Sequence, residues 1–114
     1  LLPLKQKEAM QALLAAAKWA AVQARQASDA AETRALGAER VATEVQRAYR
    51  QGYQAMPLAR RPQASRVAEQ AAAAARLARC EAEGVLRRAE LAEQALAKRR
   101  GELAQISAAI SISD

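Results

Sequence analysis

Two long stretches of this sequence carry small apolar residues in alternating steps of three and four positions. In the first half of the chain this stripe consists of Met10, Leu14, Ala17, Ala21, Ala24, Ser28, Ala31, Ala35, Ala38, Ala42, Val45 and Tyr49. In the second half it consists of Ala71, Ala75, Ala78, Ala82, Val85, Ala89, Ala92, Leu96, Arg99, Leu103, Ile106 and Ile110. A mean step of about 3.5 residues keeps one side of a helix turned toward one partner helix. The pattern predicts an all-α protein in which two long helices pack coiled-coil-like along an alanine-rich seam.

The residues that stop helices divide the chain. We expect helices over about 5–51 and about 62–107, a bend over about 52–61, and a frayed or extended tail over 108–114, all within one domain of residues 1–114. Pro57 and Pro62 forbid a continuous helix, and Gly52 is expected to cap the first helix in the left-handed conformation. Gly37 interrupts the first helix and is interpreted as a point of close approach. Because a short loop joins two helices of equal length, the expected arrangement is an antiparallel hairpin.

Folding back at the bend sets the expected register of the two stripes. It places Val45 near Ala68 and Met10 near Leu103. Alanine favours the helix strongly but buries little apolar surface, so such a seam stabilises a hairpin weakly. The composition therefore predicts that further partner surface is needed.

Several bulky apolar side chains lie off the stripes and are the candidate partner-binding residues. They are Trp19, Leu13, Val22 and Leu36 in the first helix and Leu77, Leu86 and Leu91 in the second. Trp19 is singled out because tryptophan is enriched at interface hot spots. Tyr49 and Tyr53 at the bend are a second candidate contact, although they could instead close the end of the hairpin. Scattered exposed apolar residues also occur on proteins that bind nothing there.

The charge of the chain is +6, which raises the possibility of nucleic-acid or anionic-membrane binding. Acids and bases are interspersed, with eight bases and five acids over 1–51 and eight and seven over 62–114, as on the solvated faces of long helices. Arg60, Arg61 and Arg66 form the one local basic cluster. A nucleic-acid-associated basic helical protein is therefore the alternative, with nucleic acid the less favoured partner.

Catalytic and metal-binding chemistry find little support. The chain has no histidine and a single cysteine, Cys80, which we expect to be a small packed residue. No phosphate loop, nucleophile motif or metal-ligand spacing occurs, so we expect no enzyme activity, cofactor or small-molecule substrate. No apolar run approaches the length of a membrane span.

The alanine-rich helical pattern resembles that of the rod-shaped stalk and chaperone subunits of bacterial secretion and flagellar export machines, and equally that of small accessory subunits of large organellar complexes. The resemblance covers the whole chain, rests on periodicity and transfers no residue. We therefore expect a structural or protein–protein interaction subunit that binds other subunits or itself, with a secretion-type stalk or chaperone as an alternative. We expect it to be soluble or peripheral, with an intracellular location favoured and a mitochondrial or bacterial origin both compatible. The first residue is Leu1, which fits a processed chain or part of a longer one.

Overall fold

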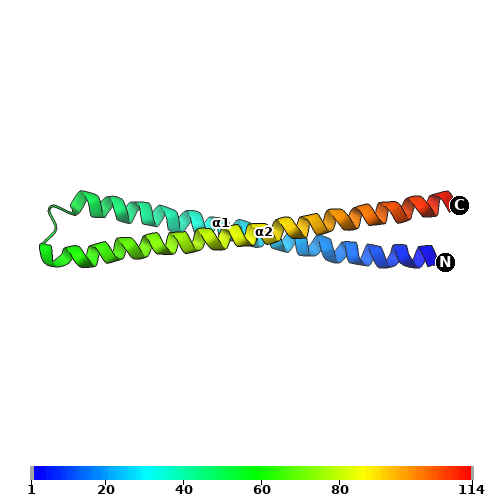
Figure 1. Ribbon diagram of the computed structural model, residues 1–114, viewed down its shortest axis with the longest axis horizontal. Coiled ribbons are helices and arrows are strands. Elements are labelled where there is room, and N and C mark those ends of the chain that lie inside the picture. The colour runs from blue at the N-terminus through cyan, green and yellow to red at the C-terminus, as the bar shows by residue number, and fades with distance from the viewer. Residues whose placement is uncertain (1, 114) are drawn as a thin grey trace. The chain divides into compact units, whose positions relative to one another are not determined.

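The computed structural model describes residues 2–113, and the side chains of residues 3–112. Helix α1 spans Leu2–Gly52, a short 3-10 helix η1 spans Leu58–Arg60, and helix α2 spans Arg61–Ser113 (Figure 1). No strand occurs among the described residues. The predicted all-α fold, a helical hairpin of two long helices that pack against each other, is confirmed.

The helix bounds follow from residue types. Alanine, arginine, glutamate and leucine fill both helices, and these residues carry the smallest costs of helix formation. Pro3 and Pro62 each lie within the first turn of a helix, where the missing N–H has no intrahelical partner to lose. The first helix therefore begins at Leu2, a little earlier than residue 5, because nothing in residues 2–4 opposes it.

The chain divides into two compact units. The first is formed by the described parts of Leu1–Ser28 and Val85–Asp114, and the second by Asp29–Gly84, which includes the loop and η1. Each unit pairs one segment of α1 with one segment of α2 in opposite directions (Figure 1). The start of α1 and the end of α2 therefore lie at the same end of the first unit.

The first unit has a small core. Ala21 and Ala89 are its buried apolar residues, and Ser28 is its buried polar residue. Met10 and Leu103 remain half-buried farther toward the ends of the helices. Larger side chains therefore contribute to this unit only through partial burial.

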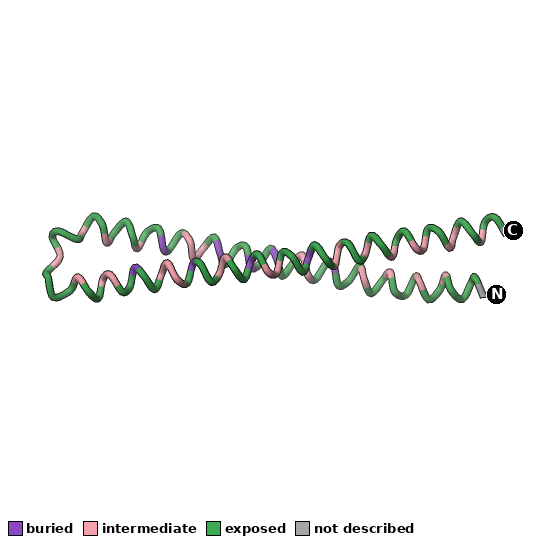
Figure 2. Tube along the Cα trace, in the orientation of Figure 1, coloured by how far each residue is buried: buried purple, intermediate pink, exposed green. Residues whose placement is uncertain are grey.

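The core of the second unit consists of alanine alone. Its buried apolar residues are Ala31, Ala35, Ala42, Ala68, Ala75 and Ala82. Figure 2 colours buried positions purple, and within this unit they occur on both α1 and α2. The short methyl side chain lets two helix backbones approach closely, but each layer removes little apolar surface from water.

The predicted seam is where the structure places the contacts. All twelve positions of the first stripe and all twelve of the second are buried or half-buried. Arg99, the charged interruption, is half-buried and donates a hydrogen bond to Glu102 at 3.2 Å. The guanidinium thus finds a carboxylate one turn away, which offsets the loss of an apolar residue at this position.

Three expectations about the ends and the glycines are wrong. Residues 108–113 are helical and not an extended tail, because serine and isoleucine cost less than about 0.7 kcal/mol each relative to alanine and no proline intervenes; Asp114 lies outside the described residues. Gly52 does not adopt a positive φ. A Cβ on Gly37 would meet nothing within 4 Å, because this position lies beside the stripe and not on it.

Cys80 is exposed, which corrects the expectation of a packed side chain. It lies two positions after Ala78 and two before Ala82. Since each residue turns the helix by about 100°, a side chain two positions from both seam residues points away from the seam. Within the described residues, neither helix has a segment of the length and apolar character that crossing a bilayer requires.

Candidate interaction surfaces

The predicted partner-binding residues of the first unit are exposed but point in different directions. Trp19, two positions from both Ala17 and Ala21, lies on the side of α1 away from the seam, with 64% of its surface exposed. Leu13 precedes the stripe residue Leu14, and Val22 follows the stripe residue Ala21, so they lie on opposite flanks of the seam. Trp19 and Val22, three positions apart, are neighbours on the surface of α1, whereas Leu13 lies on the other flank.

One of these flanks carries an ion pair between α1 and α2. Arg25 donates two hydrogen bonds to Glu93, from Nε to Oε2 at 3.0 Å and from Nη2 to Oε1 at 2.5 Å. Val22 lies one turn before Arg25, and Leu86 lies one heptad before Glu93, so both apolar residues share this flank. Leu91 is exposed as well, at 63%.

In the second unit, one flank is covered by ion pairs. The Arg79 guanidinium donates to Glu39 through Nε at 3.2 Å and Nη2 at 2.5 Å, and to Glu32 through Nη1 at 2.5 Å. Leu36 lies one turn from both glutamates, on the same flank, and is exposed. Arg34 and Glu81 form a looser pair at 3.5 Å.

These hydrogen bonds shift the titration of the carboxylates. The two bonds from Arg79 hold the pKa of Glu39 below its ordinary value, and those from Arg25 do the same for the pKa of Glu93. Partial desolvation opposes both shifts but does not reverse them. The same bonds raise the pKa of Arg79 further above its already high value, so its guanidinium stays charged.

At the loop, the two tyrosines lie together. The rings of Tyr49 and Tyr53 meet edge to face at 5.4 Å between centroids, and the Arg61 guanidinium lies 4.3 Å from the centroid of the Tyr53 ring. Arg61 also donates to the carbonyl of Met56 at 3.3 Å. This cluster ties the end of α1 to the start of α2, as expected of residues that close the hairpin; binding of a partner by the tyrosines stays a prediction.

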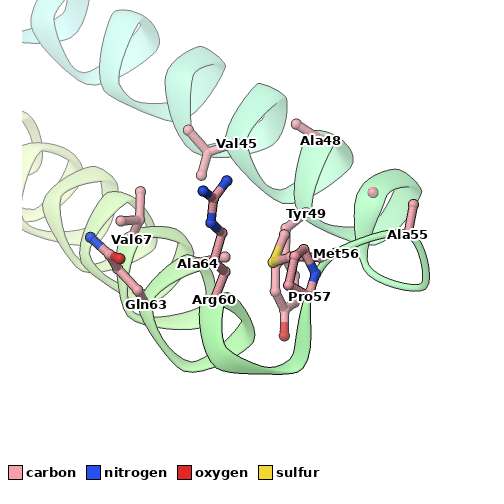
Figure 3. A pocket seen from close by; sticks show the side chains of 11 residues that line it. Val45, Ala48, Tyr49, Ala55, Met56, Pro57, Arg60, Gln63, Ala64 and Val67 are labelled. Carbon is pink, nitrogen blue, oxygen red and sulfur yellow. The ribbon is translucent and has the colours of Figure 1, made fainter.

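A hollow of about 640 Å³ opens beside this cluster. Its walls come from both helices and the loop: Val45, Ala48, Tyr49, Gly52, Ala55, Met56, Pro57, Ala64 and Val67, with Arg60 and Gln63 as the polar members. Figure 3 shows Arg60 extending its side chain from η1 toward Val45 of α1. We call this hollow the loop-end pocket.

Sequence reasoning missed the loop-end pocket. Its residues are scattered over 45–67 and follow no motif. The sequence offered one signal, the small residues Ala48, Gly52 and Ala64 beside the stripe and near a proline-containing loop. Small side chains leave space where two helices separate. That signal becomes specific only once the loop path is known.

The arginines around this end lack carboxylate partners. No ion pair joins Arg47, Arg50, Arg60 or Arg66 to a carboxylate within residues 2–113. Over 43–70, five arginines face only Glu44 and Glu69 as acids. The loop end of the second unit is therefore strongly basic.

Among the described residues, no cluster of three or more histidine, cysteine, aspartate or glutamate side chains is placed to hold a metal ion. Comparison of the chain with protein families, with curated proteins and with solved structures found no match.

Proposed function

We propose that this protein is a non-enzymatic structural or protein–protein interaction subunit of a larger assembly. One observation carries the proposal. Every buried apolar residue of the described part is an alanine, whereas large apolar side chains are exposed, with Trp19, Leu77 and Leu91 each more than 60% exposed.

This distribution is the reverse of what a self-sufficient monomer usually has. Burial of apolar surface contributes about 25 cal/mol per Å², so the larger possible gain lies with the exposed leucines, valines and tryptophan and not with the alanines. Association with other protein surface would realise that gain. The stalk or chaperone alternative is a narrower form of the same proposal.

The test uses Trp19, the only tryptophan of the chain. The protein is isolated with its partners from the cells that make it, and binding of purified partners is then measured with the wild type and with Trp19→Ala. The substitution is expected to leave helical content unchanged and to weaken association by about 2 kcal/mol, the scale of a hot-spot residue. Tryptophan emission is expected to shift to the blue on binding.

Gln26→Ala provides the matched control. Gln26 is exposed, lies one heptad after Trp19 on the same side of α1, and is expected to have little effect. A chain that is found alone in mild extracts would contradict the proposal. Equal affinities of Trp19→Ala and wild type would remove Trp19 from the interface.

The unpaired arginines favour nucleic acid as the second candidate partner. If phosphates bind there, affinity for a DNA or RNA duplex should fall steeply with salt, because each phosphate contact releases a counterion. Weak binding at low salt that vanishes near physiological salt would instead indicate non-specific attraction.

A further inference from the structure

The loop-end pocket combines an apolar lining with one charged side chain. Val45, Val67 and Met56 supply apolar walls, and Arg60 extends its guanidinium across them (Figure 3). No carboxylate of the described residues pairs with this guanidinium. A ligand that fits must therefore present apolar groups and negative charge together.

The apolar surface continues from the pocket along one flank of the second unit. Ala48 and Val67 line the pocket, Val41 lies one heptad before Ala48, and Ala74 lies one heptad after Val67. Leu77, two heptads after the pocket residue Gln63 and one heptad after the exposed Gln70, lies on the same flank and is 72% exposed. This flank ends at the Arg34–Glu81 ion pair, because Arg34 lies one heptad before Val41 and Glu81 one heptad after Ala74. Arg79 closes the opposite flank with Glu32 and Glu39.

The groove between the two helices favours a helical partner over an extended peptide. Apart from their ends, α1 and α2 satisfy their own backbone groups, so an extended peptide would gain no main-chain hydrogen bonds here. A helix brings its backbone already satisfied and can lay apolar side chains at i, i+3 or i+4 and i+7 into the groove.

We propose that the loop-end pocket and the flank that continues it are the docking site for an amphipathic helix of a partner protein, one that places acidic residues opposite Arg60. The inference rests on the proposed function and names the chemistry of one partner. Charge complementarity supports it, because Arg60 is the one charged residue that lines the loop-end pocket and has no carboxylate partner among the described residues.

Other occupants fit less well. A second copy of this chain carries the same charge of +6 and would bring arginines toward arginines. A nucleic-acid backbone would satisfy Arg60 but offers no aliphatic group to cover Val45 and Val67. Both, and an anionic membrane, are outcomes that the experiment separates.

The experiment selects ligands for the purified full chain from a display library of amphipathic helical peptides with leucine fixed at i, i+3, i+4 and i+7 and the other positions random. Enriched sequences are expected to carry aspartate or glutamate at one end. The best of them, synthesised with a fluorophore, is titrated against the wild type and four variants.

Two variants alter the site. Arg60→Glu is expected to weaken the acidic peptide about tenfold or more and to gain affinity for the analogue with lysine in place of the acids, because the interaction becomes attractive again. Ala48→Trp, at an exposed wall position, is expected to fill the pocket and to weaken binding by about tenfold or more. Circular dichroism checks that both variants remain helical.

Two matched variants are the controls. Arg47→Glu makes the same charge change outside the loop-end pocket, and Ala30→Trp adds the same bulk at an exposed position of α1 that does not line this pocket. Both are expected to change affinity less than about twofold.

The proposal is overturned if the library yields no peptide or yields peptides rich in basic residues. It is also overturned if Arg47→Glu and Arg60→Glu weaken peptide binding equally, or if the chain associates with itself and Ala48→Trp abolishes that association. Vesicles of phosphatidylcholine and phosphatidylserine, or a DNA duplex, that displace the peptide and bind in an Arg60-dependent manner would assign the site to a membrane or to nucleic acid. An isolated chain without native partners would refute the proposed function instead. If the protein is isolated in a native complex but the library yields no peptide, only this docking site is refuted.

Discussion

Arg79 links two carboxylates of α1 to one guanidinium of α2. Its bonds to Glu39 and Glu32, seven residues apart, span two turns of the partner helix. Together with Arg25–Glu93, these bonds hold the helix segments in register where the alanine seam itself offers little to tell one register from the next. Exposed pairs contribute modestly to stability, and their value here is in specifying the alignment.

The lowered pKa values of Glu39 and Glu93 predict how stability depends on pH. Because each carboxyl has a lower pKa in the folded chain than its ordinary value of 4.5, the unfolded chain binds more protons as the solution is acidified. The stabilisation is fully present above that ordinary value and is lost as the pH falls through the folded pKa. Thermal melts followed by circular dichroism should show a lower Tm at pH 3 than at about pH 5.

A pair of substituted variants checks the assignment. Glu39→Gln with Glu93→Gln should flatten the dependence of Tm on pH over this range. Glu83→Gln with Glu90→Gln, exposed positions for which no ion pair is seen, should retain it. If the two double variants behave alike, the pairs with Arg79 and Arg25 do not set the acid sensitivity.

The helix-interior glycines predict a gain in stability. A Cβ at Gly37 or Gly84 would meet nothing within 4 Å, and neither residue has a positive φ. Gly37→Ala and Gly84→Ala should therefore each raise the free energy of unfolding by about 0.5 to 1 kcal/mol, the difference in helix propensity. Chemical denaturation measures this, with Gly52→Ala at the end of α1 as a control that should gain less. A loss of stability at Gly37 would restore the close approach expected from the sequence.

At the scale of the elements, the loop is short and ordered by its own bonds. Met56 N–H donates to Tyr53 O at 3.2 Å, and Arg60 N–H donates to Pro57 O at 2.9 Å. These turns carry the chain from Gly52, where α1 ends, through Pro57 to η1. The turn thus depends on local hydrogen bonds and not on a left-handed glycine at position 52.

The register of the seam is testable by crosslinking within each unit. Cysteine pairs at Val45 with Ala68, and at Met10 with Leu103, in a Cys80→Ser background should form disulfides within one chain, because each pair joins positions that face each other in the expected register. Mass shifts on non-reducing gels report the closed loops, and a pair shifted by one helix turn at Leu14 with Leu103 should react more slowly. Failure of the Met10 pair beside success of the Val45 pair would mean that the segments of the first unit pair differently.

For the molecule as a whole, an alanine core sets an upper limit on stability. No side chain larger than alanine is fully buried among the described residues. We expect the isolated chain to be helical but to melt broadly and at low temperature, or else to associate so that its Tm rises with concentration. Circular dichroism melts over a range of concentrations, beside sedimentation, separate these cases. A sharp, concentration-independent transition of a monomer at high temperature would show that the hairpin needs no partner.

Only part of the candidate site could be predicted from the sequence. Exposure of Trp19, Leu77 and Leu91 followed from their positions off the stripes. The sequence could not predict which of these residues lie on the same flank, because the side of a helix that forms ion pairs depends on where the partner helix lies. The loop-end pocket likewise depends on the path of residues 53–60.

The sequence by itself determined the two helices, the break between them and the seam, because a step of about 3.5 residues has only one geometric solution on a helix and proline ends it. Tertiary structure decided the rest. Packing α2 against α1 gave Arg79 two partners and left Arg60 without one, and it placed ion pairs on both flanks of the second unit while leaving the loop end of one flank apolar. These outcomes depend on distances between residues far apart in the chain, which periodicity along each helix does not encode.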